Sequence, residues 1–84
     1  MYRYEIVADA RVQVDGLPTD ALLHYAELIS FLELTPWEGP PYRDDKPDGS
    51  MRRMVFGPDG GGLVVYVVLE QDRRVVVVSV TWIG

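Results

Sequence analysis

The pattern of apolar and polar residues near the N-terminus predicts a strand followed by a short second element. Residues 2–7 alternate tyrosine and isoleucine with arginine and glutamate, which is the period of a half-buried strand. Residues 9–15 fit two structures: Asp9 suits the cap of a short helix, whereas the apolar side chains at even positions alternate as they do in a strand. We favour the helix for this segment.

The main helix is predicted after a break at Gly16-Leu17-Pro18. Proline suits the first position of a helix, and the helical pattern extends from Pro18 to Glu33 or Leu34. Helical spacing predicts a buried face that consists of Leu22, Tyr25, Ala26, Ile29 and Leu32. The opposite face is expected to contact water and contains Asp20, His24, Glu27 and Ser30.

A long segment rich in proline and glycine separates this helix from the next strand. Residues 35–50 carry a tryptophan and a tyrosine among four prolines and two glycines. Irregular segments of this length are uncommon, and the length of this one suggests a function. Residues 51–56 follow as a strand, and a glycine-rich connection over residues 57–62 leads into the last part of the chain.

The remaining residues predict a β-hairpin, because almost all of them are β-branched. Its strands are Leu63–Glu70 and Arg73–Ile83, joined by a two-residue turn at Gln71-Asp72. This turn would pair Glu70 with Arg73, Val68 with Val75, Tyr66 with Val77 and Val64 with Ser79.

The two faces of this hairpin differ in polarity. The more uniformly apolar face is expected to pack under the helices and consists of Leu63, Val65, Val67, Leu69, Val76, Val78, Val80 and Trp82. The other face is expected to be open and consists of Val64, Tyr66, Val68, Arg73, Val75, Val77, Ser79 and Thr81. Exposed apolar patches mark interfaces. The predicted partner-binding residues are therefore Val64, Val68, Val75 and Val77.

The composition is that of an ordinary globular domain. With 84 residues, 48% hydrophobic and 25% charged, the chain is expected to form one domain over residues 1–84. It has no cysteine and one histidine, so we expect no metal site and no cofactor. A formal net charge of -5 has the wrong sign for general binding to nucleic acid. The absence of a signal peptide and of a membrane-spanning run predicts a cytoplasmic protein that does not contact a membrane.

Several motifs, in the order in which they occur, resemble the RelE/ParE superfamily of type II toxins. They are Tyr2-Arg3-Tyr4-Glu5-Ile6, Leu17-Pro18, Pro36-Trp37, Pro41-Tyr42-Arg43, Met51-Arg52-Arg53-Met54-Val55-Phe56-Gly57 and Gly62-Leu63-Val64-Val65-Tyr66-Val67-Val68. The resemblance covers nearly the whole chain, and it is closer to small actinobacterial members that end in a valine-rich strand and a tryptophan, here Val75 to Trp82. It implies an α+β fold with one strand, two helices and a three-stranded antiparallel meander, the helices packed on one face of the sheet.

The resemblance also implies a function. Members of the superfamily are toxins that a small antitoxin protein neutralises; one branch cleaves mRNA on the ribosome without a metal, and the ParE branch blocks DNA gyrase. Arg53 and Arg43 match basic residues of the RNA-cleaving branch and are the predicted catalytic residues. Leu63 stands where that branch has an arginine, and the residues after the last strand lack its basic side chains.

Two kinds of function follow from these residues. A ribosome-associated endoribonuclease would bind its substrate with Arg52, Lys46 and Tyr66 beside the catalytic arginines. A non-catalytic protein-binding module would instead use its apolar hairpin face to bind an antitoxin, DNA gyrase or a second copy of itself in a homodimer.

Overall fold

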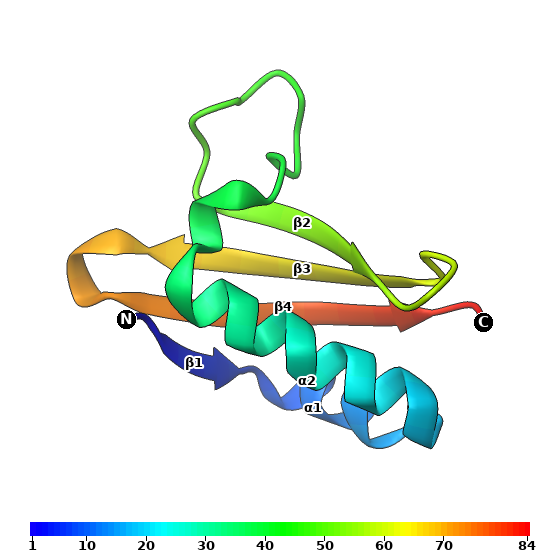
Figure 1. The fold of residues 1–84 in the computed structure, drawn as a ribbon. Coiled ribbons are helices and arrows are strands. Elements are labelled where there is room, and N and C mark those ends of the chain that lie inside the picture. Colours follow the sequence, from blue (N-terminus) through cyan, green and yellow to red (C-terminus); the bar gives the residue numbers. More distant parts are fainter.

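A four-stranded mixed sheet forms the centre of the computed structural model, which describes all 84 residues (Figure 1). Its strands are β1 (Arg3–Ile6), β2 (Met51–Phe56), β3 (Gly62–Leu69) and β4 (Arg74–Trp82), in the spatial order β1-β4-β3-β2. β1 pairs in parallel with β4, and the other neighbouring strands are antiparallel. The helical elements are α1 (Ala8–Asp15), α2 (Thr19–Leu34) and the short 3₁₀ helices η1 (Pro36–Glu38) and η2 (Glu70–Asp72). This order of elements confirms the predicted α+β fold.

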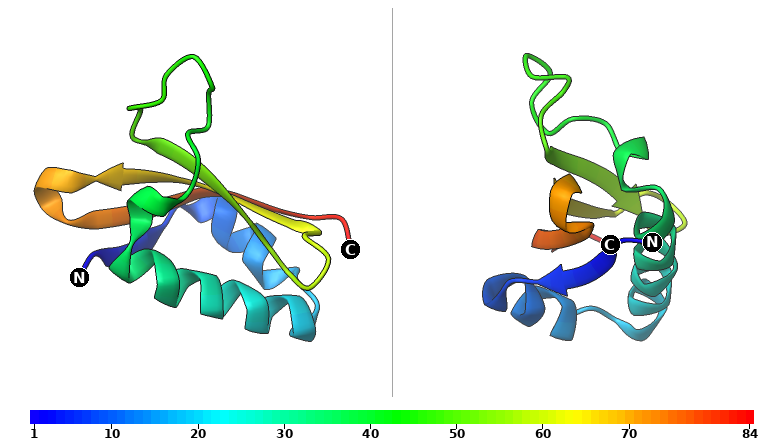
Figure 2. Two further views of the ribbon diagram at one scale, coloured as in Figure 1. Left: turned by 45° about the horizontal axis from the view of Figure 1, so that its top comes forward. Right: turned by 90° about the vertical axis from the view of Figure 1, so that its left-hand side faces the viewer.

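Helix α2 covers one face of the sheet, as the views in Figure 2 show. Its buried side chains recur every three or four residues and are Ala21, Tyr25, Leu28, Ile29 and Leu32. The prediction that Leu22 and Ala26 belong to this face is wrong, and both are exposed. Each follows a buried residue by one position, and one position along a helix turns a side chain by about 100°.

Helix α1 resolves the ambiguity over residues 9–15 in favour of a helix. The pairing of β1 with β4 ends where the Val7 N–H donates to the Val77 carbonyl. Farther along β4, α1 lies beside the strand, and the Gln13 Oε1 atom accepts a hydrogen bond of 2.7 Å from the Val80 N–H. Ala10 is fully buried in the same core that α2 covers. The short helix therefore protects part of a strand edge that would otherwise be unpaired. Neither helix has a stretch long and apolar enough to cross a lipid bilayer.

The β3–β4 hairpin pairs near its turn as predicted, with Val68 opposite Val75 and Tyr66 opposite Val77. The predicted two-residue turn is wrong, because four residues, 70–73, connect the strands. The last of these residues has a φ of 51°, which closes the loop in the left-handed conformation. The longer turn removes one residue from each strand, so the register is preserved.

A β-bulge changes the pairing farther from the turn. Val78 has no opposite residue on β3, so Val64 lies opposite Val80 and not opposite Ser79 as predicted. Because the bulge adds one residue to β4, each later residue of this strand faces the opposite side of the sheet from the one predicted. Val80 is therefore buried in the core. Ser79 and Thr81 therefore lie on the face that points away from α2.

The hairpin face that was expected to be open is the core of the protein. Tyr66 and the four predicted partner-binding valines are at most 2% exposed, and the valines are Val64, Val68, Val75 and Val77. The prediction is wrong because the residues that gave this face its polar character do not lie on it. Arg73 belongs to the turn, and the bulge directs Ser79 and Thr81 to the other side. These four valines stabilise the fold and are not accessible to a partner.

Candidate interaction site on the open sheet face

On the face of the sheet opposite α2, no helix covers β2 and β3 (Figure 2). The residues of these strands that point to this face are mostly apolar. We define the open sheet face by seven apolar residues: Met51, Val55, Leu63, Val65, Val67, Leu69 and Val76. The prediction that the β3 and β4 members of this set pack under the helices is wrong. Val55 is 61% exposed and Met51 is 40% exposed, the β3 and β4 members are partly exposed, and Val65 in the middle of the face is only 8% exposed. Exposed apolar surfaces of this kind mark interaction sites.

Two arginines border the open sheet face, and carboxylates balance both. An Nη2 atom of Arg53 on β2 lies 3.7 Å from the Asp44 Oδ1 atom. Arg74 on β4 contacts Glu5 at 2.9 Å and Asp72 at 3.3 Å. The open sheet face therefore has an apolar centre and a nearly neutral margin. This arrangement suits contact with another protein better than contact with a phosphate backbone.

The loop before β2 brings other predicted site residues to one end of this face. Arg43 and Lys46 line a hollow of about 320 Å³ together with Tyr42 and Met51. The Arg43 guanidinium donates two hydrogen bonds to the Asp45 carboxylate, at 3.1 and 2.9 Å. Because Arg53 pairs with the adjacent Asp44, both predicted catalytic arginines lie near the same loop. Each is already engaged by an aspartate.

Arg52 has a structural role, and its prediction as a substrate-binding residue is wrong. Its side chain is buried at 9% exposure and donates to three backbone carbonyls of the preceding loop. Nε bonds to Gly49 at 3.0 Å, Nη1 to Gly39 at 3.1 Å and Nη2 to Pro47 at 2.9 Å. The guanidinium also lies over the Trp37 ring, 4.9 Å from its centroid. These contacts use the donors that a phosphate would need, so Arg52 organises the loop.

Tyr66 is also part of the structure and not of a binding surface, contrary to its prediction as a substrate-binding residue. It is fully buried, and its hydroxyl donates a 2.7 Å hydrogen bond to the Pro36 carbonyl. Burial raises the pKa of Tyr66 to about 12, so the phenol stays neutral near neutral pH. Gly39 fits closely above this hydroxyl, since a Cβ at that position would lie 2.2 Å from it. Tyr66 therefore anchors η1 to the sheet.

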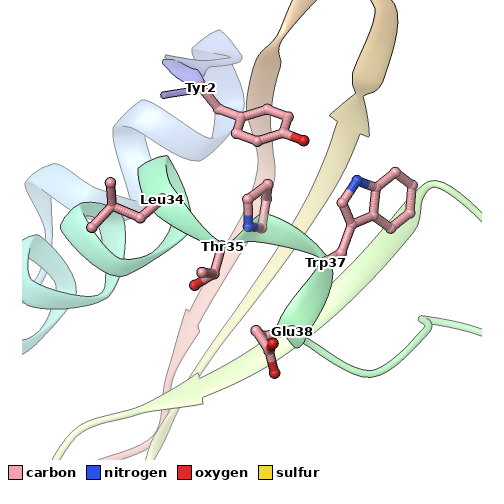
Figure 3. Close-up of a pocket in the computed structure, with 6 residues that line it drawn as sticks. Tyr2, Leu34, Thr35, Trp37 and Glu38 are labelled. Atoms are coloured by element: carbon pink, nitrogen blue, oxygen red, sulfur yellow. The ribbon is translucent and has the colours of Figure 1, made fainter.

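A cluster around Glu70 was not recognised from the sequence. The Glu70 Oε1 atom accepts hydrogen bonds from the Tyr2 hydroxyl and from the Trp37 indole N–H, the latter at 2.8 Å. Its Oε2 atom accepts from Arg73 at 3.0 Å, and the Arg73 guanidinium lies 4.2 Å from the centroid of the Tyr2 ring. Figure 3 shows the Tyr2 hydroxyl and the Trp37 indole nitrogen directed toward the same region. Glu70 thus joins the hairpin turn to η1 and to the N-terminus.

The Glu70 cluster predicts a change at acid pH. Hydrogen bonds from Trp37 and Tyr2 hold the pKa of Glu70 below its ordinary value of 4.5. These hydrogen bonds to the ionised Glu70 carboxylate therefore contribute fully to stability above pH 4.5, the ordinary pKa of the group. The contribution is lost as the pH falls through the lower pKa that Glu70 has in the folded protein. We expect the Trp37 emission of a Trp82→Phe protein to change in an acid titration, and Glu70→Gln to remove that change. Identical titrations with and without Glu70→Gln would contradict this role.

Solved structures of RelE toxins share this architecture. The isolated E. coli RelE toxin superimposes with a TM-score of 0.81 at 14% identity, over 100% of this chain and 86% of that chain. For the intact E. coli RelBE toxin–antitoxin complex, the TM-score is 0.78 at 15% identity, over 100% and 99% of the two chains. The archaeal RelE–RelB complex from Pyrococcus horikoshii superimposes with a TM-score of 0.67 at 18% identity, over 99% of this chain and 96% of that chain. No protein-family model and no curated protein matches the sequence. The chain has a RelE-like fold.

Proposed function

We propose that this chain is the toxin subunit of a type II toxin–antitoxin pair and that its partner is a small antitoxin protein. The observation that carries the proposal is a RelE-like fold over the whole chain, combined with an open apolar sheet face. The similar RelE proteins of E. coli and P. horikoshii form complexes with RelB. A doubly substituted variant of E. coli RelE also forms a complex with a peptide of the antitoxin RelB.

The open sheet face is the surface that we assign to the antitoxin. Burial of apolar surface contributes about 25 cal/mol per Å², and ordering and association costs offset part of it. A face whose exposed members include Val55 and Met51 can therefore support association without any catalytic group. The paired charges of Arg53 and Arg74 at its margin leave no strong charge that a protein partner would have to neutralise.

The assignment is tested with a Val67→Lys and Val76→Lys double variant. These two residues lie opposite each other on the open sheet face. We expect the double variant to stay folded and to lose most of its affinity for the protein encoded beside this chain, measured by calorimetry, because two ammonium groups would be buried in the contact. Val12→Lys, on the exposed side of α1, is the matched control and should bind normally. Undiminished binding by the double variant would show that the partner contacts another surface.

Cleavage of mRNA is the second candidate, favoured by the position of three basic residues. Arg43 and Lys46 line the hollow beside Met51, and Arg53, two residues farther along β2, reaches Asp44 of the same loop. Positive groups placed in this way can stabilise the charge that develops on a phosphate during cleavage. A phosphate would have to displace Asp44 and Asp45 from the arginines, so the chain would act as a weak nuclease.

The nuclease candidate predicts that Arg43→Ala with Arg53→Ala abolishes mRNA cleavage in cells and leaves the melting temperature nearly unchanged. Both side chains are at least partly exposed, and each removed ion pair contributes little to stability. Primer extension on total RNA measures the cleavage. Retained cleavage in the double variant would contradict the assignment, and arrested supercoiling in a purified gyrase assay with intact mRNA would favour DNA gyrase as the target.

A further inference from the structure

The outer face of α2, on the side away from the sheet, carries exposed leucines toward both of its ends, with Glu27 and Ser30 between them. Leu23, Ala26, Ser30 and Leu34 recur every three or four residues and all are exposed, which places them in one stripe on this face. Leu23 is 65% exposed and Leu34 is 64% exposed. Leu22 and Phe31 are also exposed and lie on the two opposite flanks of this stripe, since nine residues separate them. A helix that only had to cover the sheet would carry polar residues at positions 23, 26 and 34, as it does at position 30. We call this surface the α2 outer stripe.

The net charge of the whole chain resides in the segment that contains this helix. Residues 12–42 include no lysine or arginine and five carboxylates, which are Asp15, Asp20, Glu27, Glu33 and Glu38. The other residues carry eight basic and eight acidic side chains, so they are formally neutral and the net charge of -5 belongs to this segment. Of the carboxylates on α2 and η1, Glu27 contacts the His24 imidazole at 3.3 Å, and the other three, Asp20, Glu33 and Glu38, have no ion-pair partner.

Hollows lie at both ends of the α2 outer stripe. One is formed at the start of the helix by Thr19, Asp20, Leu22, Leu23 and Ala26. The other, of about 210 Å³, lies at the end of the helix and is lined by Leu34, Trp37, Glu38 and Tyr2 among others (Figure 3). Leu22 and Leu34 are about 18 Å apart along the helix axis at 1.5 Å per residue. This span accommodates three to four turns of a partner helix, and the second hollow adds aromatic rings and a carboxylate, which suit a cationic side chain.

We propose that the α2 outer stripe docks a cationic amphipathic helix of a partner protein. Leucine-type side chains of that helix cover the stripe, and its lysines or arginines face the carboxylates of Asp20, Glu27 and Glu38. Nucleic acid and anionic lipid surfaces carry the same sign of charge as this face and are repelled by it. This docking surface lies on the opposite side of the molecule from the open sheet face and does not depend on the proposed toxin function.

A second copy of this chain does not supply such a helix. α1 contains a single arginine, Arg11, and α2 contains neither arginine nor lysine. Two α2 outer stripes placed face to face would bring like charges together. The occupant is therefore a different protein.

The test uses two synthetic peptides of about 14 residues, a length that spans the stripe as a helix. The first has leucine at every third or fourth position and lysine elsewhere, and the second keeps the leucines and has glutamate in place of lysine. We expect the lysine peptide to bind in calorimetry and to shift the NMR signals of α2 amides and of the Trp37 indole. The glutamate peptide should not bind.

Variants of this chain distinguish docking of the peptide on the α2 outer stripe from general attraction between a cationic peptide and an acidic protein. Leu23→Ser with Leu34→Ser keeps every charge and changes two side chains that are mostly exposed, and it should weaken binding by about tenfold or more. Val12→Ser, at an equally exposed apolar position on α1, should bind as the wild type does. Unchanged binding by the Leu23/Leu34 variant, equal binding of both peptides, or shifts confined to the open sheet face would overturn the proposal. None of these outcomes bears on whether the chain arrests growth.

Discussion

Val77→Lys is expected to abolish cooperative thermal unfolding of this protein. Val77 is fully buried between the sheet and α2, and the cluster that surrounds it contains no acidic residue. An uncompensated charge in such a site costs about 4 kcal/mol or more. A domain of this size has a free energy of unfolding of only about 5 kcal/mol. The variant should therefore be largely unfolded at room temperature in circular dichroism.

Val76→Lys is the matched control, since it makes the same substitution at the neighbouring residue. Val76 lies on the open sheet face, where its new ammonium group can reach water. We expect a cooperative transition with a melting temperature a few degrees from that of the wild type. If Val76→Lys unfolds the protein and Val77→Lys does not, the two faces of the hairpin are assigned the wrong way round.

Arg52→Met should destabilise the protein by about 3 kcal/mol, because it keeps the aliphatic stem and removes hydrogen bonds from a charged donor to three carbonyls. The loop over residues 39–50 should become more mobile, since these bonds and the contact with Trp37 hold it. Urea denaturation measures the first effect. Faster hydrogen exchange at Tyr42, whose N–H donates to the Met51 carbonyl, measures the second.

Arg53→Met tests whether this effect belongs to Arg52 alone. Arg53 is the next residue on β2, but its side chain is part-exposed and has one ion pair at 3.7 Å. Its replacement should change the free energy of unfolding by about 0.5 kcal/mol or less. Equal destabilisation by the two variants would contradict the structural role of Arg52.

The order of the elements could be predicted from the sequence because each element has a strong local pattern. The break before Pro18, the helical spacing up to Leu34 and the β-branched hairpin depend on neighbouring residues only. The side of the hairpin that faces α2 could not be predicted in the same way. Both sides of β3 and β4 are rich in valine, and the bulge at Val78, which depends on pairing across the sheet, moves Ser79 away from the core.

The candidate site was predictable only in part, for a related reason. Arg52 and Arg53 are indistinguishable in the sequence, yet a strand directs adjacent side chains to opposite faces. The carbonyls that bind Arg52 come from a loop whose shape has no periodic pattern. Likewise, Glu70 contacts Trp37 and Tyr2, which are 33 and 68 residues away in the chain. No local pattern can predict such contacts.

Growth of cells that express this chain tests the proposed toxin function most directly. Induction of the chain alone should slow growth, and co-expression of the small protein encoded beside it should restore growth. The Val67→Lys and Val76→Lys variant, which changes the open sheet face and leaves the core intact, should no longer be rescued by that partner. Unimpaired growth of cells that contain the wild-type chain at high soluble concentration would contradict the proposal that it is a toxin.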